Sequence, residues 1–293
     1  MVPQTVDDVV AALARHGYVA DRGLAVTILL ALELGRPLFL EGEAGVGKTE
    51  VAKVLAAILD TDLIRLQCYE GLDVNHALYE WDYARQMLAI RLIEARGEGG
   101  EAGLTDIMSR EYLRPRPLLQ AIEAAALGRR PVLLIDELDR ADEEFEAYLL
   151  ELLSDFQVTL PEIGTIRAEQ PPVVVVTSNR TREIHDALKR RCLYHWLDYP
   201  SVERELEILR VRQPEVDEAL GRQLAMAMAD LRALDLFKPP GVAETLDWAA
   251  ALRVLGAKRL TPSVFDESLG VVLKYREDLE RVREVGLETL VHE

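Results

Sequence analysis

The stretch GEAGVGKT, at residues 42–49, decides the fold of this protein. It matches the pattern G-x-x-x-x-G-K-[ST] at Gly42, Gly47, Lys48 and Thr49. In this pattern a glycine-rich loop turns tightly around a phosphate group and directs backbone N–H groups at it. An apolar run precedes the stretch at residues 37–40, and a run with helical spacing follows at 51–59. Strand, loop and helix therefore follow in the order that a phosphate-binding loop requires.

The residues of this loop have separate expected roles. Lys48 supplies positive charge to the β- and γ-phosphates, and Thr49 offers its hydroxyl to Mg²⁺. The following helix adds the positive end of its dipole. The nucleotide-binding residues predicted here are Gly42, Glu43, Ala44, Gly45, Val46, Gly47, Lys48, Thr49 and Glu50.

A second apolar run, PVLLID at residues 131–136, ends in acids. We expect Asp136 to hold Mg²⁺, directly or through water, and to belong to the nucleotide site. Glu137 follows immediately, where it can orient or deprotonate an attacking water. The alternative is that these acids only open a surface turn, together with Asp139 and Asp142. The preceding apolar strand and the phosphate loop favour the catalytic role.

Two further polar positions complete the predicted site. Asn179 ends the run VVVVTSN, where a neutral amide can hold the attacking water or sense the γ-phosphate. Arg190 and Arg191 lie too far along the chain to belong to the same phosphate loop. They are placed to reach a neighbouring subunit's nucleotide and to stabilise charge in the transition state. The alternative is that they cap the end of a helix.

The spacing of apolar runs predicts an α/β fold. Nearly unbroken Val, Leu and Ile runs separated by helices are typical of a parallel sheet buried on both faces, in a three-layer α/β/α domain. The expected strands lie at residues 37–40, 63–68, 131–136 and 173–177. After Pro200 every segment has helical periodicity, and Thr261 followed by Pro262 suggests a helix start. We therefore expect an α/β domain at residues 1–200 and a helical domain at 201–293, with the boundary near Tyr199-Pro200-Ser201.

Two segments interrupt this rhythm. Residues 97–110 are rich in glycine and acids, which predicts a mobile surface loop. Residues 155–172 alternate around a turn from Pro161 to Gly164, which predicts a short hairpin. In between, the segment FEAYLLELLSDF at 145–156 has the spacing of a core-facing helix.

Composition and charge disfavour nucleic-acid binding. The chain has 293 residues, a formal charge of −17 and a sequence pI near 4.8, so its field repels nucleic acid. No apolar run approaches the length of a membrane span, and no secretory signal is evident, so we expect a cytoplasmic protein. Cys68 and Cys192 are expected to be buried structural residues.

With these elements in order, the sequence resembles the AAA+ ATPases: GEAGVGKT as Walker A, VLLIDELD as Walker B, TSN as sensor 1 and ALKRRC as the arginine-finger segment. Within that superfamily it resembles the MoxR branch, by an insert near residues 68–112 and a hairpin near 156–170. The phrases CYEGLDVNHALYEW, DALKRRCLYHWLDYPS and KPPGVAETLDWAAAL resemble CoxD-type members, which are associated with the maturation of aerobic carbon monoxide dehydrogenase. The likeness extends over essentially the whole chain.

The resemblance implies an ATP-hydrolysing chaperone with a C-terminal helical lid. It implies ATP and Mg²⁺ as cofactors, Thr49 and Asp136 at the metal, Glu137 as the hydrolytic carboxylate and Asn179 as sensor 1. By register, Arg191 is the finger and Arg190 its neighbour. The implied partners are further copies in a hexameric ring, a von Willebrand factor A-type protein and a metalloenzyme client.

One departure concerns the sensor 2 arginine at the start of a lid helix. The corresponding stretch, residues 241–245, has no arginine. Either another basic residue such as Lys238 contacts the γ-phosphate, or the lid responds to nucleotide in a different way.

Other hypotheses stay open at this point. A monomeric P-loop kinase with a small acceptor would use Lys48 and Asp136, but it leaves Asn179 and the arginine pair without roles. The net charge disfavours a DNA-processing motor. Cys192 and His195 have a spacing that suits a metal, yet they are half of a zinc site. Tyr79, Trp81 and Tyr83 form either a small local core or a surface for a client protein.

Overall fold

The computed structural model describes residues 3–96, 107–160 and 163–292. Contacts within the chain divide it into two compact units. The first unit contains residues 26–40 and 55–195, and the second contains residues 3–25, 41–54 and 196 onward. The predicted boundary between residues 1–200 and 201–293 remains a prediction.

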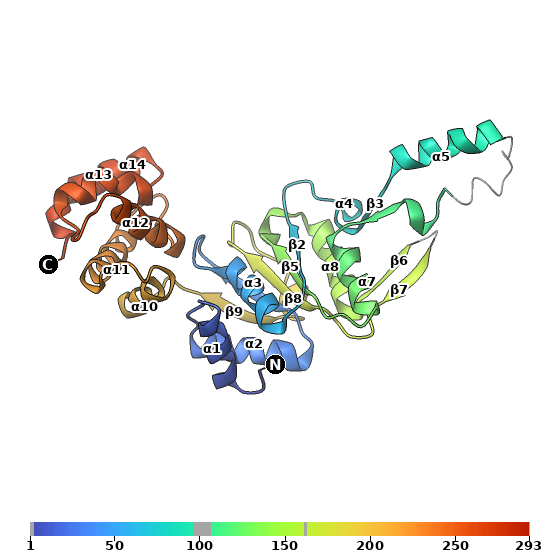
Figure 1. Ribbon diagram of the computed structural model, residues 1–293, viewed down its shortest axis with the longest axis horizontal. Coiled ribbons are helices and arrows are strands. Elements are labelled where there is room, and N and C mark those ends of the chain that lie inside the picture. Colours follow the sequence, from blue (N-terminus) through green and yellow to red (C-terminus); the bar gives the residue numbers. More distant parts are fainter. Residues whose placement is uncertain (1–2, 97–106, 161–162, 293) are drawn as a thin grey trace. The chain divides into compact units, whose positions relative to one another are not determined.

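A parallel five-stranded sheet with flanking helices forms the centre of the fold, which confirms the predicted α/β class (Figure 1). Its strands, in spatial order, are β2 (Leu63–Gln67), β5 (Val132–Asp136), β8 (Val173–Ser178), β1 (Leu38–Gly42) and β9 (Leu193–Leu197). Every residue of β1, β5 and β8 is buried, as expected for strands covered on both faces. The four strands predicted from apolar runs are all present.

Strand β9 was not predicted. Its five residues, LYHWL, include only one that is fully buried, Leu197. Strand prediction relied on runs of Val, Leu and Ile, and in β9 the two leucines are separated by Tyr194, His195 and Trp196. Its aromatic residues were the available signal.

The helices outside the C-terminal segment precede β1 or lie between the strands in the chain. They are α1 (Val6–Arg15), α2 (Arg22–Leu34), α3 (Lys48–Leu59), α4 (Val74–Leu78), α5 (Tyr83–Arg96), α7 (Pro117–Ala126), α8 (Glu143–Asp155) and α9 (Asp186–Lys189), with short 3-10 turns η1 (Arg110–Tyr112) and η2 (Leu138–Arg140). Helix α8 confirms the predicted core-facing helix. Asp142 caps it by accepting a hydrogen bond from the N–H of Phe145, and Phe145, Leu149 and Leu152 are buried.

The segment after β2 forms a small subdomain. Strands β3 (Tyr79–Trp81) and β4 (Leu113–Pro115) pair antiparallel. The rings of Tyr79 and Trp81 meet edge to face with centroids 5.9 Å apart, and both pack against the main core. Tyr83 is 68% exposed on α5. The aromatic cluster is therefore divided between a local core and the surface.

The predicted hairpin is confirmed, with β6 (Gln157–Leu160) paired antiparallel with β7 (Gly164–Arg167). Residues 161–162 of its turn lie outside the described residues. Most of the predicted surface loop, residues 97–106, also lies outside them.

The C-terminal segment is helical, as predicted. It contains α10 (Val202–Arg212), α11 (Glu218–Ala233), α12 (Val242–Val254), α13 (Pro262–Val272), α14 (Arg276–Val285) and the 3-10 turn η3 (Leu287–Thr289). Trp248, Phe265 and Leu269 lie at the centre of its core. Thr261 caps α13 by accepting a hydrogen bond from the N–H of Val264, and Pro262 is the first helical residue.

Both cysteines are buried thiols, as expected, and burial raises the pKa of each to about 12. Among the residues that the structure describes, no helix combines the length and the apolar character that a membrane crossing requires.

Candidate active site

The phosphate loop in the second unit is shaped by close backbone contacts. Gly42 has φ +154°, and a Cβ atom there would lie 2.3 Å from the carbonyl oxygen of Leu197. No side chain can fit against that carbonyl oxygen, which explains the first glycine of the motif. Gly45 and Gly47 have φ of +79° and +96°, in the region that favours glycine. The chain can therefore turn tightly between β1 and α3.

Lys48 directs its charge into this loop. It is the first residue of α3 and is only 6% exposed. Its ammonium group donates to the carbonyl oxygens of Gly42 at 2.7 Å and Glu43 at 2.6 Å. A buried cation among backbone carbonyls at a helix N-terminus fits the polyphosphate group that the motif implies. Thr49, the second residue of α3, supplies a hydroxyl beside it.

Glu50 connects the same helix to the lid helix α10. It forms ion pairs with Lys53 at 3.0 Å and Arg212 at 3.2 Å. Burial raises the pKa of Glu50, but the hydrogen bonds and charges of Lys53 and Arg212 outweigh that effect and hold the pKa below its ordinary value. Glu50 therefore joins the first turn of α3 to Lys53 and to Arg212 of α10.

The start of α12 lies against the phosphate loop, at the place where the resemblance implies sensor 2. The N–H groups of Val242 and Ala243 point at the carbonyl oxygen of Gly45, at 3.0 and 3.4 Å. A Cβ atom on Gly241 would lie 2.8 Å from the carbonyl oxygen of Ala44. The start of α12 therefore contacts the loop through its backbone, and no arginine takes part in this contact.

The side chains near this contact bear on the two alternatives for sensor 2. Glu244 accepts a hydrogen bond from the N–H of Gly241 at 2.9 Å, so an acid stands on the first turn of α12. Lys238 is exposed, and its backbone N–H bonds to Asp278 at 3.2 Å. Whether the C-terminal segment responds to nucleotide through Lys238 or in another way stays a prediction.

The predicted acids lie in the first unit, where β5 ends. Asp136 is 2% exposed and accepts a hydrogen bond from the Thr177 hydroxyl at 2.6 Å. The same hydroxyl oxygen accepts the backbone N–H of Glu137 at 2.9 Å. Thr177 on β8 therefore fixes both acids, and β5 and β8 lie side by side in the sheet (Figure 1).

The backbone turns sharply at Glu137. Its φ of +55° and ψ of +51° place a residue other than glycine in the left-handed region, which is uncommon and often marks a functional position. The carboxylate accepts from the amide of Gln67 at 3.0 Å and from Arg140 at 3.4 Å. A carboxylate held at a strand end by donors suits the role of a base that orients water.

Asn179 is held by an acid whose role sequence analysis did not identify. Asp139 is 3% exposed and accepts the N–H of Asn179 at 3.1 Å. It also accepts the N–H and hydroxyl of Thr181, at 2.9 and 2.7 Å. Asp139 thus ties the loop after β8 to the turn after β5. The signal was its position in the acidic stretch after VLLI, where we considered it only as part of a surface turn.

The arginine pair lies on the surface at the end of α9. Arg190 and Arg191 are both exposed. The Arg191 guanidinium donates to the carbonyl oxygen of Leu150 and to the hydroxyl of Ser154 on α8. Arg36 donates to the carbonyl oxygens of residues 190, 191 and 192, at 2.7, 3.2 and 3.2 Å. Arg36, Ser154, Arg190 and Arg191 are among the residues that line a hollow of 410 Å³.

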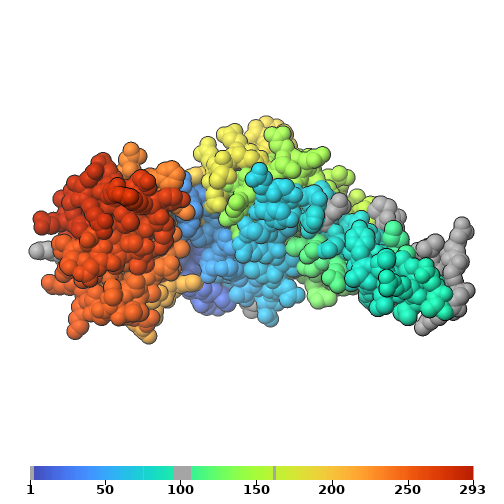
Figure 2. Space-filling model, turned by 90° about the horizontal axis from the view of Figure 1, so that it is seen from above, coloured from blue at the N-terminus to red at the C-terminus, as the bar shows by residue number. Residues whose placement is uncertain are grey.

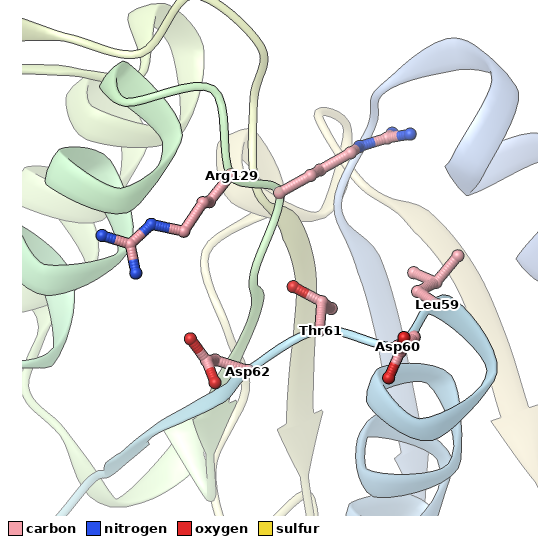
Figure 3. Close-up of a pocket in the computed structure, with 6 residues that line it drawn as sticks. Leu59, Asp60, Thr61, Asp62 and Arg129 are labelled. Carbon is pink, nitrogen blue, oxygen red and sulfur yellow. The ribbon is translucent and has the colours of Figure 1, made fainter.

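A larger hollow lies elsewhere in the first unit. It has a volume of 540 Å³, and Figure 3 shows the side chains that line it: Leu59, Asp60, Thr61, Asp62, Arg129 and Arg130. Asp62 precedes β2 and Arg130 nearly adjoins β5, so this hollow lies at the amino ends of those strands. The catalytic acids lie at a carboxyl end. Ligands of α/β sheets bind at the carboxyl ends, and this hollow is therefore not the expected nucleotide site.

Within residues 3–96, 107–160 and 163–292, no group of three or more His, Cys, Asp or Glu side chains has the arrangement of a metal site.

The comparison with protein families decides the identity of the fold. The family described as "AAA domain (dynein-related subfamily)" matches residues 37–192. This span is more than half of the chain and contains the phosphate loop, the acids, Asn179 and the arginine pair. The chain belongs to this AAA family.

Two relatives of this AAA protein are each described as an uncharacterized protein. YehL of Escherichia coli (strain K12) is 28% identical over 173 residues, which cover 56% of this chain and 42% of YehL. SH1500 of Staphylococcus haemolyticus (strain JCSC1435) is 24% identical over 208 residues, which cover 69% of this chain and 70% of the relative. This chain thus spans less than half the length of YehL.

Solved structures share the fold of this AAA protein. A RuvB mutant of Thermotoga maritima superposes with a TM-score of 0.50 at 18% identity, covering 92% of this chain and 73% of that one. A second RuvB mutant gives a TM-score of 0.51 at 18% identity, and the superposition covers 92% of this chain and 72% of the mutant's chain. Similarity at this level of identity concerns the fold alone.

Proposed function

We propose that this AAA protein is a Mg²⁺-dependent ATPase of the MoxR type. The observation that carries the proposal is the pair Asp136 and Glu137, fixed by one threonine at the carboxyl end of β5, in a chain with a complete phosphate loop. Neither the acids nor the phosphate loop alone would support hydrolysis. A phosphate loop by itself only binds nucleotide, and acids without such a loop have no bound substrate to act on.

The phosphate loop would bind the triphosphate. Backbone N–H groups of residues 43–48 surround the phosphates, and Lys48 exchanges its contacts with the carbonyl oxygens of Gly42 and Glu43 for contacts with phosphate oxygens. The N-terminus of α3 adds its dipole. Because α12 bonds to the carbonyl oxygen of Gly45, a change in the loop on nucleotide binding would pass directly to the lid.

Thr49 and Asp136 would hold Mg²⁺, because a hydroxyl and a carboxylate are ligands that this ion accepts. When bound, Mg²⁺ neutralises charge on the phosphates. Glu137 would accept a proton from the attacking water, while Asn179, held by Asp139, would position that water or sense the γ-phosphate.

The exposed arginine pair supports a shared active site. Arg191 or Arg190 would reach the nucleotide of a neighbouring subunit and stabilise the transition state, as expected in a hexameric ring. Arg36 would hold the backbone of this segment in position through its three hydrogen bonds to carbonyl oxygens. A monomeric kinase would need neither an exposed arginine pair nor the hydrogen bonds from Arg36 that hold its backbone.

We also propose a chaperone role in the cytoplasm. The MoxR and CoxD resemblance supports a von Willebrand factor A-type partner and a metalloenzyme client such as carbon monoxide dehydrogenase. Helix α5 offers a surface for a client, because Tyr83, Met87, Leu88 and Leu92 are half or more exposed. In Figure 1 this helix extends away from the sheet, and it lies at the surface in Figure 2.

The proposal can be tested by measuring ATP hydrolysis against protein concentration, with oligomer size read by light scattering in the presence of ATP. We expect turnover per subunit to rise as a ring-sized species forms. Flat turnover by a monomer would contradict the ring. Phosphate transfer to a small acceptor without release of free phosphate would instead support a kinase.

A further inference from the structure

Arg65 makes a contact that the proposed ATPase mechanism does not use. It lies on β2, two residues before Gln67 and therefore on the same side of the strand. Strand β2 pairs with β5 in a register that sets Gln67 opposite Asp136. The Arg65 guanidinium reaches the same carboxylate, with Nη2 at 2.5 Å and Nε at 3.1 Å from Oδ2 of Asp136.

The charge balance explains why this contact forms. The Asp136 side chain is 3% exposed, and a carboxylate at that depth requires a positive partner or a set of donors. The Thr177 hydroxyl donates to Oδ1, while Arg65 supplies the charge at Oδ2. Arg65 donates two N–H groups to Oδ2, which engages both lone pairs of that oxygen.

A neighbouring amide holds the guanidinium in this orientation. Nη2 of Arg65 also donates to Oε1 of Gln67 at 2.5 Å. The Arg65 side chain is nevertheless 50% exposed, so it can turn into solvent without breaking the core. The Arg65 guanidinium is thus hydrogen-bonded to Asp136, but its exposure allows it to break this contact and turn into solvent.

We propose that Arg65 is the counter-cation of Asp136 in the metal-free protein, and that a divalent cation must displace its guanidinium to use Oδ2. Arg65 is therefore a positioning residue, which holds the buried carboxylate in place until the metal binds. The assignment of the metal to this carboxylate rests on the proposed ATPase function. The displacement lowers the apparent affinity for the metal, because the ion pair is broken as the metal binds.

The test is binding of Mn²⁺, a paramagnetic substitute for Mg²⁺, measured by electron paramagnetic resonance without nucleotide. Arg65→Gln removes the charge, and we expect it to lower the half-saturating Mn²⁺ concentration about tenfold, which corresponds to about 1.4 kcal/mol. Arg65→Lys keeps a charge but cannot make both contacts with Oδ2. We expect its half-saturating Mn²⁺ concentration to lie between those of the parent protein and Arg65→Gln. Arg283→Gln is the matched control, because Arg283 is also about half exposed and paired with an acid, Asp266.

An unchanged or higher half-saturating concentration in Arg65→Gln overturns the proposal. If Arg65→Gln does not fold, as judged by circular dichroism, Arg65→Lys decides alone, since it must bind Mn²⁺ more tightly than the parent protein. A parallel titration with a fluorescent ATP analogue separates the two hypotheses. If the parent protein does not bind the ATP analogue, the proposed ATPase function is contradicted. The metal titration would still decide the role of Arg65.

Discussion

The phosphate loop and the acidic end of β5 are built in different ways. The loop is fixed by backbone: a glycine lies against the carbonyl oxygen of Leu197, and another lies against the lid helix. The acids are fixed by side chains from other strands, namely Arg65, Gln67 and Thr177. Backbone contacts cannot be exchanged without refolding, whereas side-chain contacts can. The loop is therefore suited to hold a ligand, and the acids are suited to change partners during a reaction cycle.

The largest effect should come from a side chain placed in the backbone-built region. We expect Gly42→Ala to destabilise the fold by more than about 4 kcal/mol, because its Cβ would collide with a backbone oxygen that has no room to move. Gly35→Ala is the control, since Gly35 also has positive φ but nothing lies within 4 Å of its Cβ position. Chemical denaturation measures both. Equal losses for the two variants would show that the close contact with Leu197 does not matter.

The second effect concerns chemistry rather than folding. Glu137→Gln should lower ATP turnover by roughly 10²–10⁴-fold and leave nucleotide affinity near that of the parent protein, because an amide cannot take a proton from water. Steady-state hydrolysis and equilibrium binding measure the two quantities. Glu143→Gln, an exposed acid in the first turn of α8, should leave both unchanged. Normal turnover in Glu137→Gln would rule out this residue as the base.

A third variant tests the side chain that joins two strand ends. Asp139→Asn should cost about 2 kcal/mol of unfolding free energy, because one oxygen becomes an NH₂ group that faces donors from Asn179 and Thr181. Thermal or chemical unfolding measures the loss. Asp155→Asn, at the exposed end of α8, is the control and should change stability little. A stability equal to the parent protein would mean that Asp139 does not organise this loop.

The smallest effect should come from the support of the arginine pair. We expect Arg36→Ala to lower turnover in the assembled protein about tenfold at unchanged nucleotide affinity, because the finger backbone loses three hydrogen bonds and moves. Arg22→Ala removes an exposed surface ion pair and should have no effect. A loss of affinity rather than turnover would place Arg36 in nucleotide binding instead.

The contrast between the two regions also explains what could be predicted from sequence. Residues that act through backbone or strand order leave local patterns, so the loop after β1, the acids at the end of β5 and Asn179 after β8 could be placed from sequence, while their roles stay predictions. Partners from distant strands leave none: nothing in the segment LIRLQC indicates that Arg65 reaches Asp136. Strand β9 was missed because Tyr, His and Trp separate its two leucines, so it has no run of Val, Leu or Ile. The contact between α12 and Gly45 was invisible because it uses only backbone.

In the proposed ring, the acids of one subunit work with the arginine of the next, and a mixing experiment tests this arrangement most directly. Glu137→Gln and Arg191→Ala proteins would each be purified, measured alone, and then mixed at equal concentration with ATP. A shared site predicts that both proteins are nearly inactive alone and that mixing restores part of the turnover. In the mixture some sites combine an intact Glu137 with a neighbour's intact Arg191. If mixing gives only the sum of the separate activities although mixed oligomers form, each subunit works alone and the account is contradicted.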